Sequence, residues 1–133
     1  MSRLIGVYGI LVLLFTFGCK EEAPPNDGTF SNQIRLNQIG YYPCATKKAV
    51  VITESEISNF RIIESNSGET VFSGEISGPF IWELAGEQVG IADFSELTNE
   101  GSYQVYIEEL GYSFPFEIKD HVLLPVFHGS ITV

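Results

Sequence analysis

Short apolar segments separated by turn residues run through most of this chain and constrain its fold more than any other feature of the sequence. Between Asn37 and Lys119 the turn residues recur roughly every eight to twelve positions, and no stretch sustains the period of a helix. This combination predicts an all-β sandwich of about seven or eight antiparallel strands over residues 34–119. We expect strands within residues 34–38, 49–52, 60–64, 70–73, 80–84, 89–94, 103–107 and 112–118, with turn residues at 66–68 and 78–79 between strands.

Alternation within these segments indicates which side chains face the core. Trp82 shares one side of its segment with Phe80 and Leu84, which favours core packing. The alternative is a sugar-stacking surface made of Trp82 and four tyrosines, Tyr41, Tyr42, Tyr106 and Tyr112, because exposed aromatic rings can stack on sugars. The other expected core residues are Val50, Ile52, Phe60, Ile62, Val71, Ile81, Val89, Ile91, Tyr103, Val105, Ile107, Phe114 and Phe116. Pro115 cannot donate to a ladder, so its strand is expected at an edge or with that position turned away.

One spacing is typical of a tyrosine corner, a structural feature of sandwich domains. Leu97, Gly101 and Tyr103 have the required order. In such a corner the tyrosine hydroxyl, near the start of a late strand, bonds to the backbone a few residues upstream. These three residues are therefore expected to be architectural.

No set of residues in the sequence forms a defensible catalytic site. Glu54 and Glu56 lie in one turn and Glu108 and Glu109 in another, and both pairs are interpreted as solvated charge. Asp93, at a strand end, is expected to bond the backbone of the next turn.

Metal and cofactor sites are not expected either. His121 and His128 have no third ligand near them, which makes a zinc site improbable. No glycine-rich phosphate loop or nucleophile motif is present in the sequence.

The N-terminus predicts export. Residues 4–18 are mostly apolar, too short for a membrane span and of the length of a signal-peptide core. They end at Cys19, which is followed by Lys20-Glu21-Glu22, and this junction resembles a bacterial lipoprotein cleavage site. We therefore expect a signal peptide at 1–18 and a lipidated Cys19, with a flexible tether over residues 19–33. The protein would be secreted and anchored to the cell envelope, in the outer membrane or at the cell surface. An ordinary signal peptide or an uncleaved anchor is the alternative.

The charge and the cysteine content further limit the classes of function open to this chain. Seven Lys and Arg residues stand against seventeen Asp and Glu residues, for a net charge of −10. No basic stripe exists for phosphate contacts, so nucleic-acid binding is disfavoured. If Cys19 is acylated, Cys44 has no intramolecular partner and is interpreted as an idle loop thiol.

Two segments carry a family resemblance. They are Ile34-Arg35-Leu36-Asn37-Gln38-Ile39-Gly40-Tyr41, continued by Pro43 and residues 47–51, and Asp93-Phe94-Ser95 continued through Tyr103. Together they resemble the N-terminal immunoglobulin-like domain that precedes the catalytic barrel of glycoside hydrolase family 9. The closing Phe114-Pro115-Phe116-Glu117-Ile118 also fits.

The resemblance implies a fold and a role. The fold is an immunoglobulin-like sandwich, and in the family this domain packs on the barrel that cleaves β-1,4-glucans. No catalytic, cofactor or metal position of that barrel can be assigned here, so the chain is expected to be inactive alone. Residues 120–133, with the apolar run 122–127, are interpreted as a truncated junction towards a missing C-terminal catalytic domain.

The alternatives to a supporting module are a surface glycan-binding lipoprotein and a plain spacer. The partners expected are the catalytic domain, the membrane through the lipid anchor, and β-glucan as a candidate ligand.

Overall fold

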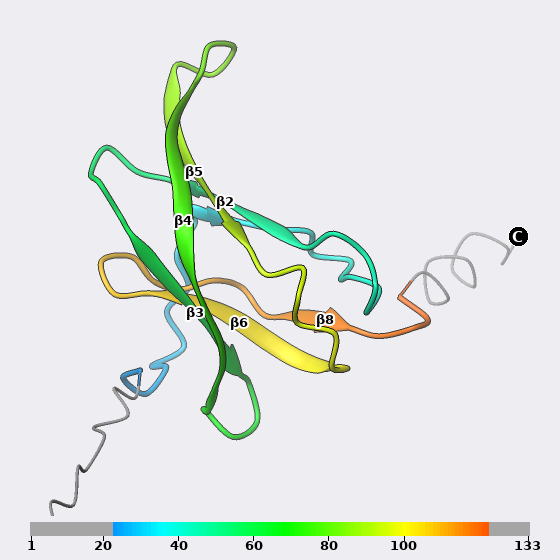
Figure 1. The fold of residues 1–133 in the computed structure, drawn as a ribbon. Coiled ribbons are helices and arrows are strands. Elements are labelled where there is room, and N and C mark those ends of the chain that lie inside the picture. The colour runs from blue at the N-terminus through cyan, green and yellow to red at the C-terminus, as the bar shows by residue number, and fades with distance from the viewer. Residues whose placement is uncertain (1–22, 123–133) are drawn as a thin grey trace, which may run out of the picture.

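The computed structural model describes residues 23–122, and these form eight strands (Figure 1). The signal segment 1–18, Cys19, His128 and nearly all of the predicted junction lie outside the described residues. The strands are β1 (Ile34–Arg35), β2 (Lys48–Ile52), β3 (Asn59–Glu64), β4 (Thr70–Trp82), β5 (Glu87–Asp93), β6 (Gly101–Ile107), β7 (Gly111–Tyr112) and β8 (Phe116–Ile118). All named strand pairs are antiparallel, which confirms the predicted all-β class.

The strands form two layers that share one long strand, β4. Sheet A contains β3, β6, β7, β8 and the first part of β4, and sheet B contains β1, β2, β5 and the second part of β4. The order β1-β2-β5-β4-β3-β6-β7 places β4 in the middle, and β8 pairs with β6. The first part of β4, up to Glu75, pairs with β3 in sheet A. The second part, from Ile76 to Trp82, pairs with β5 in sheet B. A single strand therefore crosses from one layer to the other, and Figure 1 shows its far end projecting with β5 beyond the rest of the molecule.

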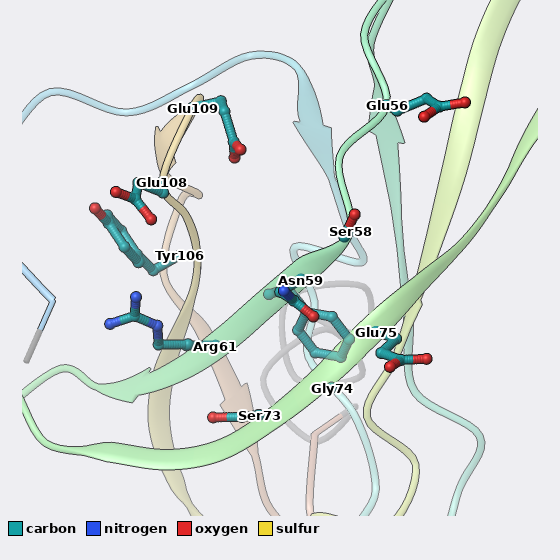
Figure 2. Close-up of a pocket in the computed structure, with 11 residues that line it drawn as sticks. Glu56, Ser58, Asn59, Arg61, Ser73, Gly74, Glu75, Tyr106, Glu108 and Glu109 are labelled. Atoms are coloured by element: carbon teal, nitrogen blue, oxygen red, sulfur yellow. The ribbon is translucent and has the colours of Figure 1, made fainter. Parts of the chain in front are cut away.

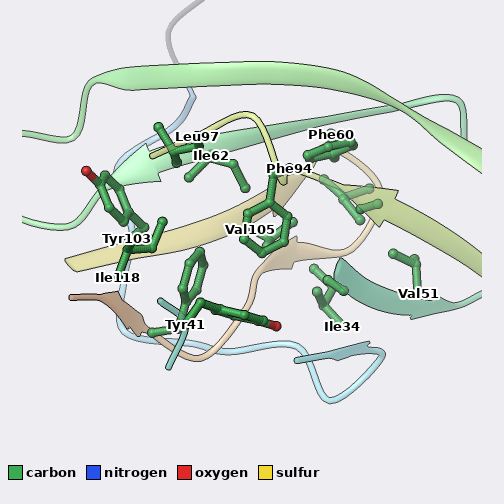
Figure 3. Packing of buried hydrophobic residues seen from close by; sticks show 14 of the residues in the cluster. Ile34, Tyr41, Val51, Phe60, Ile62, Phe94, Leu97, Tyr103, Val105 and Ile118 are labelled. Carbon is green, nitrogen blue, oxygen red and sulfur yellow. The ribbon is translucent and has the colours of Figure 1, made fainter. Parts of the chain in front are cut away.

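The core lies between the two sheets and is rich in aromatic rings (Figure 3). Phe94 is fully buried, and its ring centroid lies 5.2 Å from that of Phe116 and 5.5 Å from that of Tyr41. Aromatic pairs at such separations contribute beyond their buried area. Among the predicted core residues, Phe60, Ile62, Val89, Tyr103, Val105, Ile107 and Phe116 are buried, and Val50, Ile52 and Ile91 are half-buried.

Besides Trp82 and the two residues that share its side of the β4–β5 hairpin tip, described below, three predicted core residues are exposed, and the prediction was wrong for them. Val71 is 41% exposed, Ile81 72% and Phe114 39%. Val71 falls at the irregularity between β3 and β4, where the register shifts. Phe114 lies between β7 and β8, outside any ladder, with its ring against Phe30. Alternation predicts the face of a side chain only while the ladder is regular.

Gly78-Pro79 is not the turn that the sequence suggests. The two residues interrupt the pairing of β4 with β5, and the register shifts between Ser77 and Phe80 while the strand continues. The reversal comes later, after Trp82, whose carbonyl accepts from the amides of Ala85 and Gly86. Gly86 has a φ of 65°, which glycine adopts without strain. Proline is tolerated here because this part of β4 is a sheet edge.

The segment expected to be a tether makes contacts where it is described. The Tyr112 hydroxyl donates to the carbonyl of Pro24, and the amide of Ser31 donates to the carbonyl of Tyr112. Phe30 packs against the small cluster of Ile63, Tyr106 and Tyr112. Residues from Pro24 to Ser31 therefore lie against the edge of sheet A.

Candidate functional site

The two segments that carry the family resemblance meet at one end of the sandwich, here named the motif end (Asn37–Tyr41, Lys47 and Asp93–Ser95). The amide of Lys47 donates to the Ser95 hydroxyl at 2.9 Å, and the amide of Phe94 donates to the carbonyl of Lys47 at 3.0 Å. Phe94 and Tyr41 pack edge to face in the core beneath. Segments far apart in the chain thus form one hydrogen-bonded unit.

Tyr41 links this unit to the strand by which the chain leaves the sandwich. Its hydroxyl accepts from the amide of Asn37 at 3.0 Å and donates to the carbonyl of Lys48 at 2.9 Å. The backbone amide of Tyr41 donates to the carbonyl of Glu117, and its carbonyl accepts from the amide of Lys119. These two partners lie at the end of β8 (Phe116–Ile118), here named the exit strand. Burial raises the pKa of the Tyr41 hydroxyl, which therefore stays a donor at neutral pH. Tyr41 has a structural role and is not part of a sugar-stacking face.

Gly40 allows this close approach. Its φ is 109°, and a Cβ at this position would lie 2.6 Å from the carbonyl oxygen of Glu117. Only glycine combines this backbone conformation with that contact. The Gly-Tyr pair in the motif is therefore explained by packing against the exit strand.

The other polar residues of the motif end bond the backbone. The Asp93 carboxylate accepts from the amide of Ser95 at 3.0 Å and from its hydroxyl at 2.6 Å, as the sequence predicted. The Ser95 hydroxyl, followed by its amide, lowers the pKa of Asp93. The buried Lys47 ammonium donates to the carbonyls of Pro43 and Ala45, and burial lowers its pKa. These bonds hold two loops, and no substrate-facing group is among them.

Of the residues predicted as a tyrosine corner, Gly101 and Tyr103 lie at the start of β6 and Leu97 lies in the segment before it. The Tyr103 hydroxyl donates to the carbonyl of Asn99 at 3.1 Å and lies 3.3 Å from that of Glu100. Leu97 is buried in the core cluster. A Cβ on Gly101 would lie 2.8 Å from the Tyr103 hydroxyl, so the ring needs a residue without a side chain there.

A polar concavity of about 600 Å³ lies over the outer face of sheet A (Figure 2). It brings together Glu56, Glu75, Glu108 and Glu109. The sequence places Glu56 in one turn and Glu108 and Glu109 in another. The Arg61 guanidinium lies 5.6 Å from the centroid of the buried Tyr106 ring. All four glutamates are exposed, which agrees with the interpretation as solvated charge. Because their carboxylates are in water, they do not form the low-dielectric environment that an acid catalyst needs.

No metal site is evident in the described part of the chain. Within residues 23–122 no three His, Cys, Asp or Glu side chains are grouped so that they could hold an ion. His121 and Cys44 are both exposed. Over the same residues no helix is long and apolar enough for a membrane crossing.

The largest difference from the sequence prediction is the tip of the β4–β5 hairpin. Trp82 is 50% exposed and Phe80 52%, so the prediction that they pack in the core was wrong. Leu84, on the same parity, is 95% exposed. The alternation correctly predicts that Phe80 and Trp82 share one face of the strand. That face points away from the core, because β4 extends beyond the end of β2 here. Of the four tyrosines grouped with Trp82, only Tyr42 is exposed.

Comparisons with known proteins agree on one family. The model of the cellulase N-terminal ig-like domain matches residues 29–112. A xyloglucan-specific endo-beta-1,4-glucanase of Bacteroides ovatus is 35% identical over 130 residues, which make up 97% of this chain and 21% of that protein. Endoglucanase D of Acetivibrio thermocellus is 34% identical over 102 residues, 77% of this chain and 16% of that protein.

The solved structures give the same result. A Bacteroides ovatus GH9 structure matches with a TM-score of 0.58 at 36% identity, over 71% of this chain and 17% of that one. The chain thus spans about a fifth, or less, of the length of these similar proteins.

Proposed function

The chain belongs to the family of cellulase N-terminal immunoglobulin-like domains, and from this premise we propose that it supports a glycoside hydrolase family 9 catalytic domain. In its relatives this domain precedes such a catalytic domain. The chain itself carries no part of the hydrolytic chemistry in this proposal. The catalytic domain would act on β-1,4-linked glucans, the class named by the B. ovatus relative.

The observation that carries this proposal is the use of the motif residues. At the motif end, the polar side-chain groups of Tyr41, Lys47 and Asp93 form hydrogen bonds to the backbone. A glycine is required at position 40 because the carbonyl of Glu117 lies so close. A catalytic or binding site would leave such groups directed at a ligand. Motif residues that hold loops and an exit strand are what a supporting module needs.

A module exchange tests the proposal. We would replace the N-terminal module of the B. ovatus glucanase by the matching residues of this chain and measure the half-life of activity at an inactivating temperature. The exchanged enzyme is expected to keep a longer half-life than the enzyme without a module. Xyloglucan hydrolysis by the purified chain alone would contradict the proposal.

A second candidate function is glycan binding, favoured by the exposed rings of Phe80 and Trp82. Exposed aromatic rings at alternate strand positions can stack on sugar rings. Titration of the chain with β-glucan oligosaccharides would show saturable binding in this case and none for a purely supporting module.

We also propose that the mature chain is a lipoprotein anchored through Cys19. The support is the sequence alone, namely the apolar segment 4–18 and the position of the cysteine at its end. Metabolic labelling with palmitate, lost in Cys19→Ser, is the expected result.

A further inference from the structure

The outer face of sheet B carries a group of apolar residues, and most of them stay at least partly exposed within residues 23–122. Residues directly opposite each other in an antiparallel pair share one face. Val50 is opposite Ile91, and Ile52 is opposite Val89. Val89 is in turn opposite Phe80, one strand further across, and Trp82 follows at the tip. These six residues, Val50, Ile52, Phe80, Trp82, Val89 and Ile91, are named here the sheet-B face.

The inner face of the same strands is apolar as well. Ala49 and Ala92 are opposite each other and fully buried, as is Val51. A strand with one solvated face normally alternates apolar and polar residues, whereas a strand covered on both faces is apolar throughout. The runs 49–52 and 89–92 follow the second pattern, although Val50, Ile52 and Ile91 on their outer side are only half-buried.

The sheet-B face has the layout of an interface. A concavity of about 500 Å³ lies beside it, lined by Phe80, Ile81, Trp82, Glu83, Leu84, Val89 and Ile91. The same face also carries two ion pairs, each at 3.5 Å. Arg35, opposite Val50, pairs with Glu87, opposite Trp82. Lys48 pairs with Asp93, which lies directly opposite it. Apolar residues with charged residues beside them are a common composition of surfaces that bind another protein.

A glycan fits this face less well than a protein does. Sugar sites combine a ring platform with several hydrogen-bonding groups. Among the described residues that line the concavity, only Glu83 and the indole N–H of Trp82 offer side-chain hydrogen-bonding groups. The aliphatic Ile81 and Leu84 are its most exposed apolar members.

The position of the exit strand indicates which protein covers the face. The amide of Lys119, just after β8, donates to the carbonyl of Tyr41, and the Tyr41 hydroxyl donates to the carbonyl of Lys48. Lys48 begins β2 at one end of the sheet-B face. A domain that follows this chain segment therefore starts next to the face and can lie along it up to the hairpin tip.

We propose that the sheet-B face, with Phe80 and Trp82 as its anchors, is the surface on which the family 9 catalytic domain docks. This inference rests on the proposed function and adds to it the identity of the contact surface. Large aromatic anchors carry most of the binding energy in such contacts.

The test uses the exchanged B. ovatus enzyme in three forms: unmodified, Phe80→Ser with Trp82→Ser, and Val71→Ser as the control. Val71 is a similarly exposed apolar residue on β4, outside the part that pairs with β5. The double variant is expected to shorten the half-life of activity about tenfold, because two anchors are lost, and the control is expected to leave it unchanged. Hydrogen exchange of peptides within 80–91 should be slower in the exchanged enzyme than in the full chain alone. Far-UV circular dichroism and melting of the full chain with the same substitutions verify that each variant folds.

The two proposals fail differently. Equal half-lives of the three forms, with no slowing of exchange at 80–91, would overturn the docking surface and leave the supporting function intact. An unmodified exchanged enzyme no longer-lived than the enzyme without a module would overturn both. Saturable binding of xyloglucan oligosaccharides to the full chain, or a concentration-dependent dimer, abolished by the double variant, would assign the face to a glycan or to a second copy and overturn the proposal.

Discussion

The motif end and the sheet-B face lie next to each other but use their residues in opposite ways. At the motif end, the carboxylate of Asp93, the ammonium of Lys47 and the hydroxyl of Tyr41 all bond within the module. On the sheet-B face, Phe80 and Trp82 are half exposed and contribute nothing to the core cluster. The comparison teaches that the residues of the two motif segments explain how the module folds, while the proposed contact with a neighbouring domain uses residues outside those segments.

The largest expected effect is a loss of stability from the core below the motif end. Phe94→Ala leaves a cavity beside Tyr41 and Phe116 and should lower the free energy of unfolding by about 3–5 kcal/mol. Urea denaturation followed by circular dichroism measures the change. If Phe94→Ala lowered the free energy of unfolding less than Phe80→Ser with Trp82→Ser does, the distinction between a stabilising motif end and an exposed sheet-B face would be contradicted.

Gly40→Ala is expected to be next in size. The new Cβ would meet the carbonyl of Glu117 at 2.6 Å in a backbone conformation that alanine rarely adopts. A cost of about 2–3 kcal/mol is expected, with faster hydrogen exchange at Tyr41 and Lys119 because their mutual bonds open. Gly68→Ala is the matched control, since its φ is also positive but no atom lies within 4 Å. Equal costs for both variants would show that the backbone conformation, and not the contact with the exit strand, determines the effect.

Asp93 should give a smaller, pH-dependent effect. Its folded-state pKa is lowered, mainly by the Ser95 hydroxyl, so its stabilisation is present above the ordinary value of 3.8 and is lost as the pH falls through the folded-state pKa. Asp93→Asn should therefore reduce stability near neutral pH and approach the unmodified chain in acid. Urea titrations from pH 7 to about pH 2 measure the difference between the two proteins. A difference that does not change with pH would remove the electrostatic explanation.

The smallest expected effect is on the isolated sheet-B face. Phe80→Ser with Trp82→Ser should change the free energy of unfolding of the full chain by about 0.5 kcal/mol or less, because neither ring is packed in the core. Trp82 is the only tryptophan of the chain, so its fluorescence reports on the hairpin directly. Acrylamide should quench it strongly. Weak quenching would support the core position that alternation predicted.

Several local features could be predicted from single residues and their neighbours. The strand runs at 49–52, 89–94 and 103–107 are found where expected, and Asp93 bonds the following turn. The grouping of Glu56, Glu75, Glu108 and Glu109 could not be predicted from the sequence, because it depends on which strands lie side by side in sheet A. The position of the hairpin-tip residues could be predicted only in part. Alternation places Phe80 and Trp82 on one face but does not show whether that face is covered.

The sequence by itself determined the strand class, the family and the local bond of Asp93 to the following turn, because these follow from local alternation, short motifs and turn chemistry. The tertiary structure decided that β4 runs through Gly78-Pro79 from one sheet into the other, and so carried Trp82 beyond the end of β2. The physical reason is that burial is a property of what lies opposite a side chain. A strand pattern specifies two faces, and only the arrangement of neighbouring strands determines which of them meets the core and which meets water.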